Sequence, residues 1–108
     1  MNPADLASRE LNGPGVTDEQ LRHVGRLTGL TELAVESANI SEASLGILSG
    51  LPNLRTLSLE GTRLQPGAEK RLTGLSQLQS LDIRGTGLPG SSIDTLEKAL
   101  PNCKVRSR

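Results

Sequence analysis

The stretch with the clearest chemical potential is Gly85-Thr86-Gly87-Leu88-Pro89-Gly90, which has the spacing G-x-G-x-x-G. Between a strand and a helix, such glycines let the backbone approach a pyrophosphate at the helix N-terminus. Three observations weigh against this role. The slot 24 residues earlier reads GTRLQP, Pro89 lacks a backbone donor, and no acidic residue follows at about 20 positions. We therefore interpret the stretch as a turn and expect no cofactor.

Two further side chains could take part in catalysis or bind a metal. His23 is the only histidine, and at offsets of 24 its slot is filled by Ile47, Arg71 and Thr95, which indicates the outer side of a helix. Cys103 is the only cysteine, and most lone cysteines of this kind are small buried hydrophobes. The spacing supports no Ser-His-Asp or Cys-His set. We expect neither a catalytic site nor a metal site.

The overall composition excludes several classes of partner. Twelve basic and twelve acidic residues give the 108-residue chain a net charge of zero, so no global field attracts nucleic acid or membranes. Phe, Tyr and Trp are absent. A single compact core usually contains such rings, whereas thin layers filled by Leu, Ile and Val do not need them.

The same composition bears on the cellular compartment. A lone cysteine allows no internal disulfide and suits a reducing compartment. The N-terminal segment lacks the features of a signal peptide, and no window approaches 18 apolar residues. We expect a cytoplasmic monomer.

The elements that must position any site follow from a repeat of 24 residues. Four sets of apolar residues align at this offset, which indicates a repeat architecture. The sets are Leu30, Leu54 and Leu78; Leu33, Leu57 and Leu81; Val35, Leu59 and Ile83; and Ile40, Leu64 and Leu88.

Within each repeat, the pattern predicts one strand and one helix. We expect strands around 9–12, 33–35, 56–59 and 80–83, helices over 18–26, 42–48 and 92–99, and a short closing strand within 101–105. Residues 1–15 are interpreted as a degenerate N-terminal capping repeat and residues 16–108 as the main repeat domain with a C-terminal cap.

Two local features are less regular. Thr17 and Gln20 have the spacing of a capping box at the start of the first helix. In the third repeat, Glu69 fills a slot that is apolar in the other repeats, so either Ala68 rotates inward or this turn is looser.

The repeated motif resembles the leucine-rich repeat. It reads Leu30-x-x-Leu33-x-Val35-x-x-Ala38 and recurs at 54–62 and 78–86. The period of 24 and the Gly-Thr steps are most similar to bacterial arrays. The resemblance implies an α/β fold, a right-handed solenoid with short parallel strands on the concave face and short helices on the convex face. The usual Asn at the end of each strand is replaced here by Ala38, Thr62 and Thr86, so an Asn ladder is absent or replaced by threonine hydroxyls.

The residues that alternate with the buried leucines form rows across the concave face. These rows predict an acidic surface on which Arg84 is the one clear cation. As partner-binding residues we single out Glu32, Glu36, Ser58, Glu60, Asp82 and Arg84.

Glu36 and Glu60 should be lateral neighbours, about 4.8 Å apart at the backbone. Like charges side by side in a sheet are destabilising, and Arg84 relieves only part of the repulsion. Two explanations stay open: a partner with a basic surface, or a solvated face on which exposed carboxylates cost little.

Two functions remain after these exclusions. Solenoids present extended concave surfaces, and the resemblance implies a recognition scaffold, so the first is a protein-binding module that is not an enzyme. The alternative is a purely structural scaffold, or the C-terminal fragment of a longer repeat array, with no independent activity.

Overall fold

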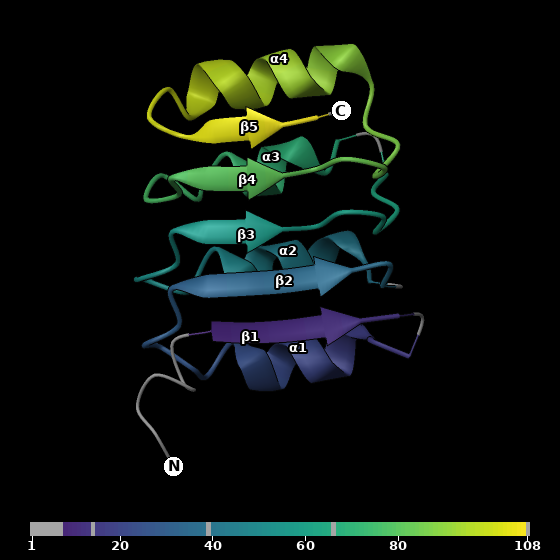
Figure 1. Ribbon diagram of the computed structural model, residues 1–108, viewed down its shortest axis with the longest axis vertical. Coiled ribbons are helices and arrows are strands. Elements are labelled where there is room, and N and C mark those ends of the chain that lie inside the picture. Colours follow the sequence, from purple (N-terminus) through teal and green to yellow (C-terminus); the bar gives the residue numbers. More distant parts are fainter. Residues whose placement is uncertain (1–7, 14, 39, 66, 108) are drawn as a thin grey trace.

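The computed structural model describes residues 8–13, 15–38, 40–65 and 67–107, which form one open sheet with helices on one side. The strands are all parallel and lie in chain order (Figure 1). They are β1 (Ser8–Asn12), β2 (Glu32–Glu36), β3 (Thr56–Ser58), β4 (Ser80–Asp82) and β5 (Lys104–Arg106). The helices are α1 (Asp18–Val24), α2 (Glu42–Leu48), α3 (Glu69–Leu72) and α4 (Gly90–Ala99).

The register between strands reproduces the sequence period. Leu33 lies opposite Leu57, and Leu57 lies opposite Leu81, so the expected leucine row is confirmed. These side chains are buried beneath the helices because alternate residues of a strand point to opposite faces. The layers of leucine above and below them complete one continuous core.

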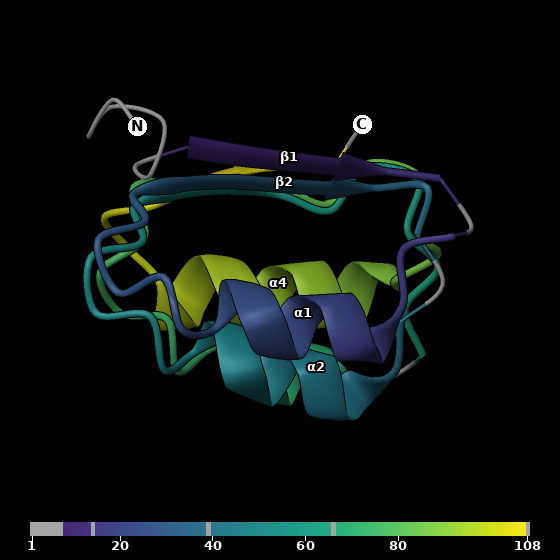
Figure 2. The ribbon, with the colours of Figure 1, turned by 90° about the horizontal axis from the view of Figure 1, so that it is seen from below.

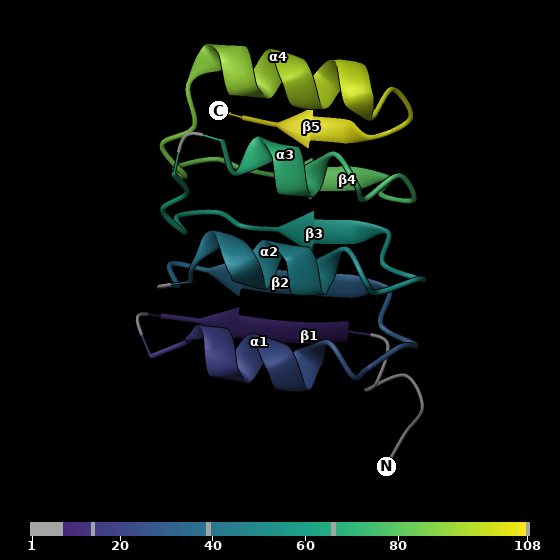
Figure 3. The same ribbon diagram turned by 180° about the vertical axis from the view of Figure 1, so that it is seen from behind.

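Helices cover only one face of the sheet, as Figure 2 shows from below and Figure 3 from behind. At the two ends of the stack, α1 lies beyond β1 and α4 beyond β5 (Figures 1 and 3). Packed helices need about 8–10 Å each, whereas adjacent strands need about 4.8 Å. These spacings favour a stack in which the helix layer is the longer side.

The first helix does not use the expected capping box. Thr17 is the N-cap residue, but its side chain makes no capping hydrogen bond, and Gln20 donates only its backbone N–H to the Thr17 carbonyl. The carboxylate of Asp18 instead accepts hydrogen bonds from the Ser41 N–H, at 2.8 Å, and from the Ser44 hydroxyl. These bonds join the first helix to the start of the next one, and they lower the pKa of Asp18.

The third repeat resolves the irregularity at Glu69. Ala68 turns inward and is 2% exposed, while Glu69 is half-buried and its carboxylate accepts the Gly67 N–H at 2.9 Å. The helix that follows spans four residues, against seven in each of the first two repeats. A carboxylate cannot replace a core leucine without a desolvation cost, so this turn rotates. Leu6, which lies 24 residues before Leu30, and Pro66, where the first turn of the third helix was expected, lie outside the described residues.

The last helix begins earlier than expected. It starts at Gly90 rather than near Ser92, and it buries Leu96 as expected. Ile93, however, is only half-buried, and the adjacent Ser92 is buried instead. In the first repeat, α1 ends at Val24, two residues before the expected end.

A threonine hydroxyl takes over part of the missing Asn ladder. Thr62 Oγ1 accepts the Ala38 N–H at 3.1 Å and donates to the Val35 carbonyl at 2.8 Å, so it joins two repeats. Thr86 does not bridge in this way, because its hydroxyl donates to the Ile83 carbonyl of its own turn at 2.7 Å.

The interpretation of Gly85 as a turn residue is supported by its equivalents. Gly13, Ser37, Gly61 and Gly85 share one slot, and all four have positive φ. In three of them, the N–H donates to a carbonyl of the following repeat, as Gly61 does to Arg84 at 2.9 Å. The turn that ends each strand therefore requires a positive φ, which glycine adopts without steric cost and which Ser37 adopts once.

Candidate interaction surface

The face of the sheet without helices is the candidate functional site, and we call it the open face. It consists of the side chains that alternate with the buried row on each strand, and the pairing register places them in rows across the strands. One row runs through Glu10, Ala34, Ser58, Asp82 and Arg106. A second runs through Ser8, Glu32, Thr56, Ser80 and Lys104. A third runs through Asn12 and Glu36, the last residues of β1 and β2, and continues just beyond β3 and β4 with Glu60 and Arg84.

Arg84 organises the centre of this surface. Its Nη2 lies 2.7 Å from Asp82 Oδ2 and 3.2 Å from Glu60 Oε2, so one guanidinium joins two neighbouring repeats. Its Nε donates to the Asp82 carboxylate as well. The Asp82 side chain is 14% exposed and that of Arg84 38% exposed, which shelters this pair more than an ordinary surface ion pair.

The Arg84 side chain, which donates to the Asp82 carboxylate, holds the pKa of Asp82 below its ordinary value. The same interaction raises the pKa of Arg84, with smaller contributions from the charges of Glu60 and Glu36. Both groups therefore stay charged at neutral pH. Their charges largely satisfy one another and do not form a reactive acid–base pair.

Glu36 and Glu60 are neighbours, as expected, because the Ser37 N–H donates to the Glu60 carbonyl at 3.0 Å. Their carboxylates nevertheless have separate partners. Glu36 Oε2 accepts the Ser58 hydroxyl at 2.9 Å, while Glu60 is paired with Arg84. Each partner offsets some of the like-charge repulsion.

The lowered pKa of Asp82 predicts that the stability of the fold depends on pH. Because the folded pKa of Asp82 lies below its unfolded value of about 3.9, the folded chain binds fewer protons, and this contribution to stability is present above that pH. It is lost as the pH falls through the folded pKa. Asp82→Asn should therefore reduce the loss of unfolding free energy between pH 6 and pH 3, as measured by urea unfolding. Asp94→Asn, on the exposed side of α4, controls for the removal of one carboxylate; equal pH slopes in the two variants would contradict the expectation.

The closing strand corrects the expected charge of this face. Lys104 lies beside Ser80 and Arg106 beside Asp82, and both are exposed, so Arg84 is not the one clear cation. The closing strand was expected, but its residues were not assigned to the face. Extending the 24-residue offset from Ser80 and Asp82 would have identified both.

Other residues with catalytic potential lie away from this surface. His23 is exposed on α1. Cys103 is a half-buried free thiol, and burial raises its pKa, which lowers its fraction of reactive thiolate. Within the described ranges, no three His, Cys, Asp or Glu side chains are grouped so that they could hold a metal ion.

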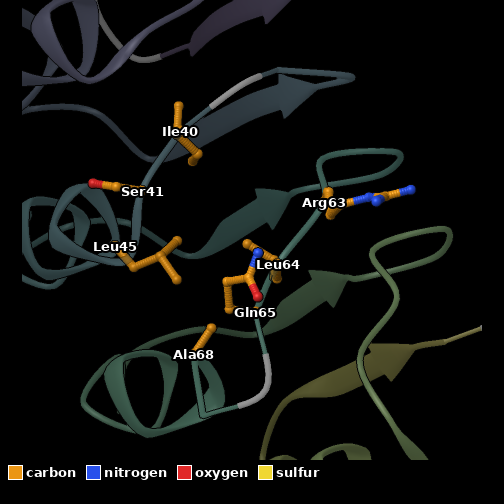
Figure 4. A pocket seen from close by; sticks show the side chains of 7 residues that line it. All are labelled: Ile40, Ser41, Leu45, Arg63, Leu64, Gln65 and Ala68. Atoms are coloured by element: carbon orange, nitrogen blue, oxygen red, sulfur yellow. The ribbon is translucent and has the colours of Figure 1, made fainter.

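A hollow of about 300 Å³ lies where the strands lead into α2 and α3 (Figure 4). Figure 4 shows Leu45 and Ala68 beside it, while the Arg63 side chain extends away from them. The lining of the hollow mixes apolar and polar side chains and contains no acid–base pair: Ile40, Ser41, Leu45, Arg63, Leu64, Gln65 and Ala68.

None of the helices in the described part of the chain is both long enough and apolar enough to span a bilayer.

Comparison with known proteins agrees with this architecture. A family model described as leucine rich repeat matches residues 28–88, which is more than half of the chain. The chain belongs to the leucine-rich repeat family. The comparison with curated proteins finds no matching relative. Leucine-rich repeat domains generally act as protein–protein interaction modules and not as catalysts. The match covers the central repeats, including β2, β3 and β4 of the open face.

Proposed function

We propose that this leucine-rich repeat domain binds a protein partner through the acidic part of its open face. The observation that carries the proposal is the one-sided cover of the sheet: helices bury one face, and the other presents charged and hydroxyl side chains in register. The residues proposed to touch the partner are Glu32, Glu36, Ser58, Glu60, Asp82 and Arg84.

The proposed mechanism is rigid docking of a basic segment or domain edge. Ladder hydrogen bonds fix the strands, and the contacts of Glu36 and Arg84 hold part of the surface in place before a partner arrives. Less side-chain entropy is then lost on binding. Because the chain has no Trp or Tyr, which dominate most interface hot spots, we expect modest, salt-sensitive affinity.

The proposal includes the compartment, the oligomeric state and the domain boundaries of the chain. We propose a monomeric, non-catalytic domain in the cytoplasm, with residues 1–15 as the N-terminal capping repeat and residues 16–108 as the binding domain. The support for the cap is that β1 is mostly exposed and carries Arg9 in the slot that Leu33 and Leu57 fill.

The test is a charge reversal at the two neighbouring carboxylates, Glu36→Lys with Glu60→Lys. Proteins retained by the immobilised wild-type chain are identified, and binding of the purified partner is then measured by calorimetry. We expect at least a tenfold loss of affinity, because several exposed charge contacts change from attraction to repulsion.

A matched control places the same charge change on the helix side, with Glu19→Lys and Glu97→Lys, both of which are exposed. This variant should bind as the wild type does. Unchanged binding by the Glu36 and Glu60 variant, with a wild-type circular dichroism spectrum and melting temperature, would refute the proposed surface.

A further inference from the structure

Among the described residues, the charged side chains of the open face that make no ion pair lie at its two opposite ends. The central carboxylates have partners, since Arg84 pairs with both Asp82 and Glu60, although one guanidinium leaves a net negative charge there. At the first two strands, Glu10 and Glu32 are exposed, and within the described residues neither makes an ion pair or a side-chain hydrogen bond. At the closing strand, Lys104 and Arg106 are exposed and likewise make no ion pair within the described residues, although Arg106 lies beside Asp82 and its charge contributes to the lowered pKa of that carboxyl.

The face therefore has a negative end and a positive end, separated by the width of the sheet. Glu10 and Arg106 share one row, and Glu32 and Lys104 share the next. Four strand spacings of about 4.8 Å separate β1 from β5, or roughly 19 Å. An extended segment of about six residues spans that distance at about 3.3 Å per residue.

The negative end also has a recess. A hollow of about 270 Å³ extends over β1, β2 and β3, and Glu10, Glu32, Thr56 and Ser58 are among the residues that line it. It forms at Ala34, whose short side chain lies between Glu10 and Ser58 in the row. Arg9 and Leu33 also line it, but they occupy the alternate strand positions that face the helix side. The recess offers carboxylates and hydroxyls to a lysine or arginine side chain.

We propose that the partner segment is ampholytic and lies across the strands with a fixed polarity. Its basic end enters the recess between Glu10 and Glu32, and its acidic end lies over Lys104 and Arg106. This inference rests on the proposed function, and it adds the orientation of the partner and the requirement for an acidic end. The charges at the two ends then set the direction in which the partner lies, in addition to the contacts made by Glu36 and Glu60.

The probes are three capped six-residue peptides, with binding measured by NMR shift titration at low salt. The block peptide carries two lysines, two serines and two glutamates in that order. The second has the same composition with lysine and glutamate alternating, and the third is Lys-Lys-Ser-Ser-Lys-Lys. Exposed charge pairs each contribute little, so we expect the block peptide to bind about five- to tenfold more tightly than the alternating one.

Charge-reversal variants at the four exposed positions test the polarity. Glu10→Lys with Glu32→Lys should remove the advantage of the block peptide. Lys104→Glu with Arg106→Glu should also remove the advantage of the block peptide. This variant should bind the third peptide, Lys-Lys-Ser-Ser-Lys-Lys, most tightly. Combining all four changes should restore the advantage of the block peptide, because the peptide can then bind in the opposite direction.

The outcomes separate this inference from the proposed function. If Lys104→Glu with Arg106→Glu leaves the ratio of block to alternating peptide unchanged while the Glu10 and Glu32 variant lowers it, the polarity is wrong and the acidic binding face stands. If neither variant changes any affinity, and the Glu36 and Glu60 reversal also has no effect, both proposals are overturned. Circular dichroism and thermal melts confirm that each variant is folded.

Discussion

Replacing Leu57 by alanine is expected to lower the free energy of unfolding by about 2–5 kcal/mol, the usual range for a buried leucine. Leu57 is 1% exposed and lies between Leu33 and Leu81 in the central strand of the sheet. The substitution removes apolar contacts and leaves a cavity that neighbouring layers cannot fill without moving. In a stack, each repeat is stabilised only by its neighbours, so damage at the centre weakens two interfaces at once.

Urea unfolding monitored by circular dichroism measures this loss. Leu11→Ala is the matched control, since Leu11 is a half-buried leucine of the end strand β1 and borders a single neighbouring strand. It should cost clearly less than Leu57→Ala. Equal losses of unfolding free energy at the two positions would contradict the expectation that damage in the central strand weakens two interfaces at once.

Thr62→Val is expected to destabilise the chain by about 2 kcal/mol, although it preserves the shape of the side chain. The Thr62 side chain is fully buried, and its hydroxyl accepts the Ala38 N–H and donates to the Val35 carbonyl. Valine would leave the buried N–H of Ala38 without an acceptor. An unpaired buried backbone group costs about 1–3 kcal/mol.

Thr86→Val provides an internal control at the equivalent slot of the next repeat. The Thr86 hydroxyl donates to the Ile83 carbonyl, and that carbonyl also accepts the Thr86 N–H at 3.3 Å. The carbonyl therefore keeps a partner after the change, and the expected loss is below about 1 kcal/mol. A loss at Thr62 no larger than that at Thr86 would mean that the bridge between repeats does not stabilise the fold.

Much of the architecture was predictable from the chain because each repeat specifies its own elements. The strand slots, the helix over 42–48, the leucine row and the inward turn of Ala68 as one of two options all follow from comparing three repeats. The capping box at Thr17 was wrong, since the Thr17 side chain makes no capping hydrogen bond. The bonds of the adjacent Asp18 to Ser41 and Ser44 of the following repeat were not predicted either, because they join two repeats.

The charge pattern of the open face shows the same division. The spacing of Glu32, Glu36 and Glu60 predicted that they share a face with Arg84. The register agrees for Glu32, which lies between Ser8 and Thr56 in a row of the open face. Which charges are satisfied was not predictable. The choice of Arg84 for Asp82 and Glu60, and of Ser58 for Glu36, depends on side-chain rotamers across neighbouring strands.

Comparing the repeats along the chain was enough to identify the period, the family and the residues of the central strands that turn away from the core, since a repeated spacing defines which side of each strand is buried. Which carboxylates are paired, and which make no ion pair among the described residues, became evident only from the folded chain. Pairing depends on distances of a few ångströms between repeats, and a one-dimensional spacing does not encode those distances.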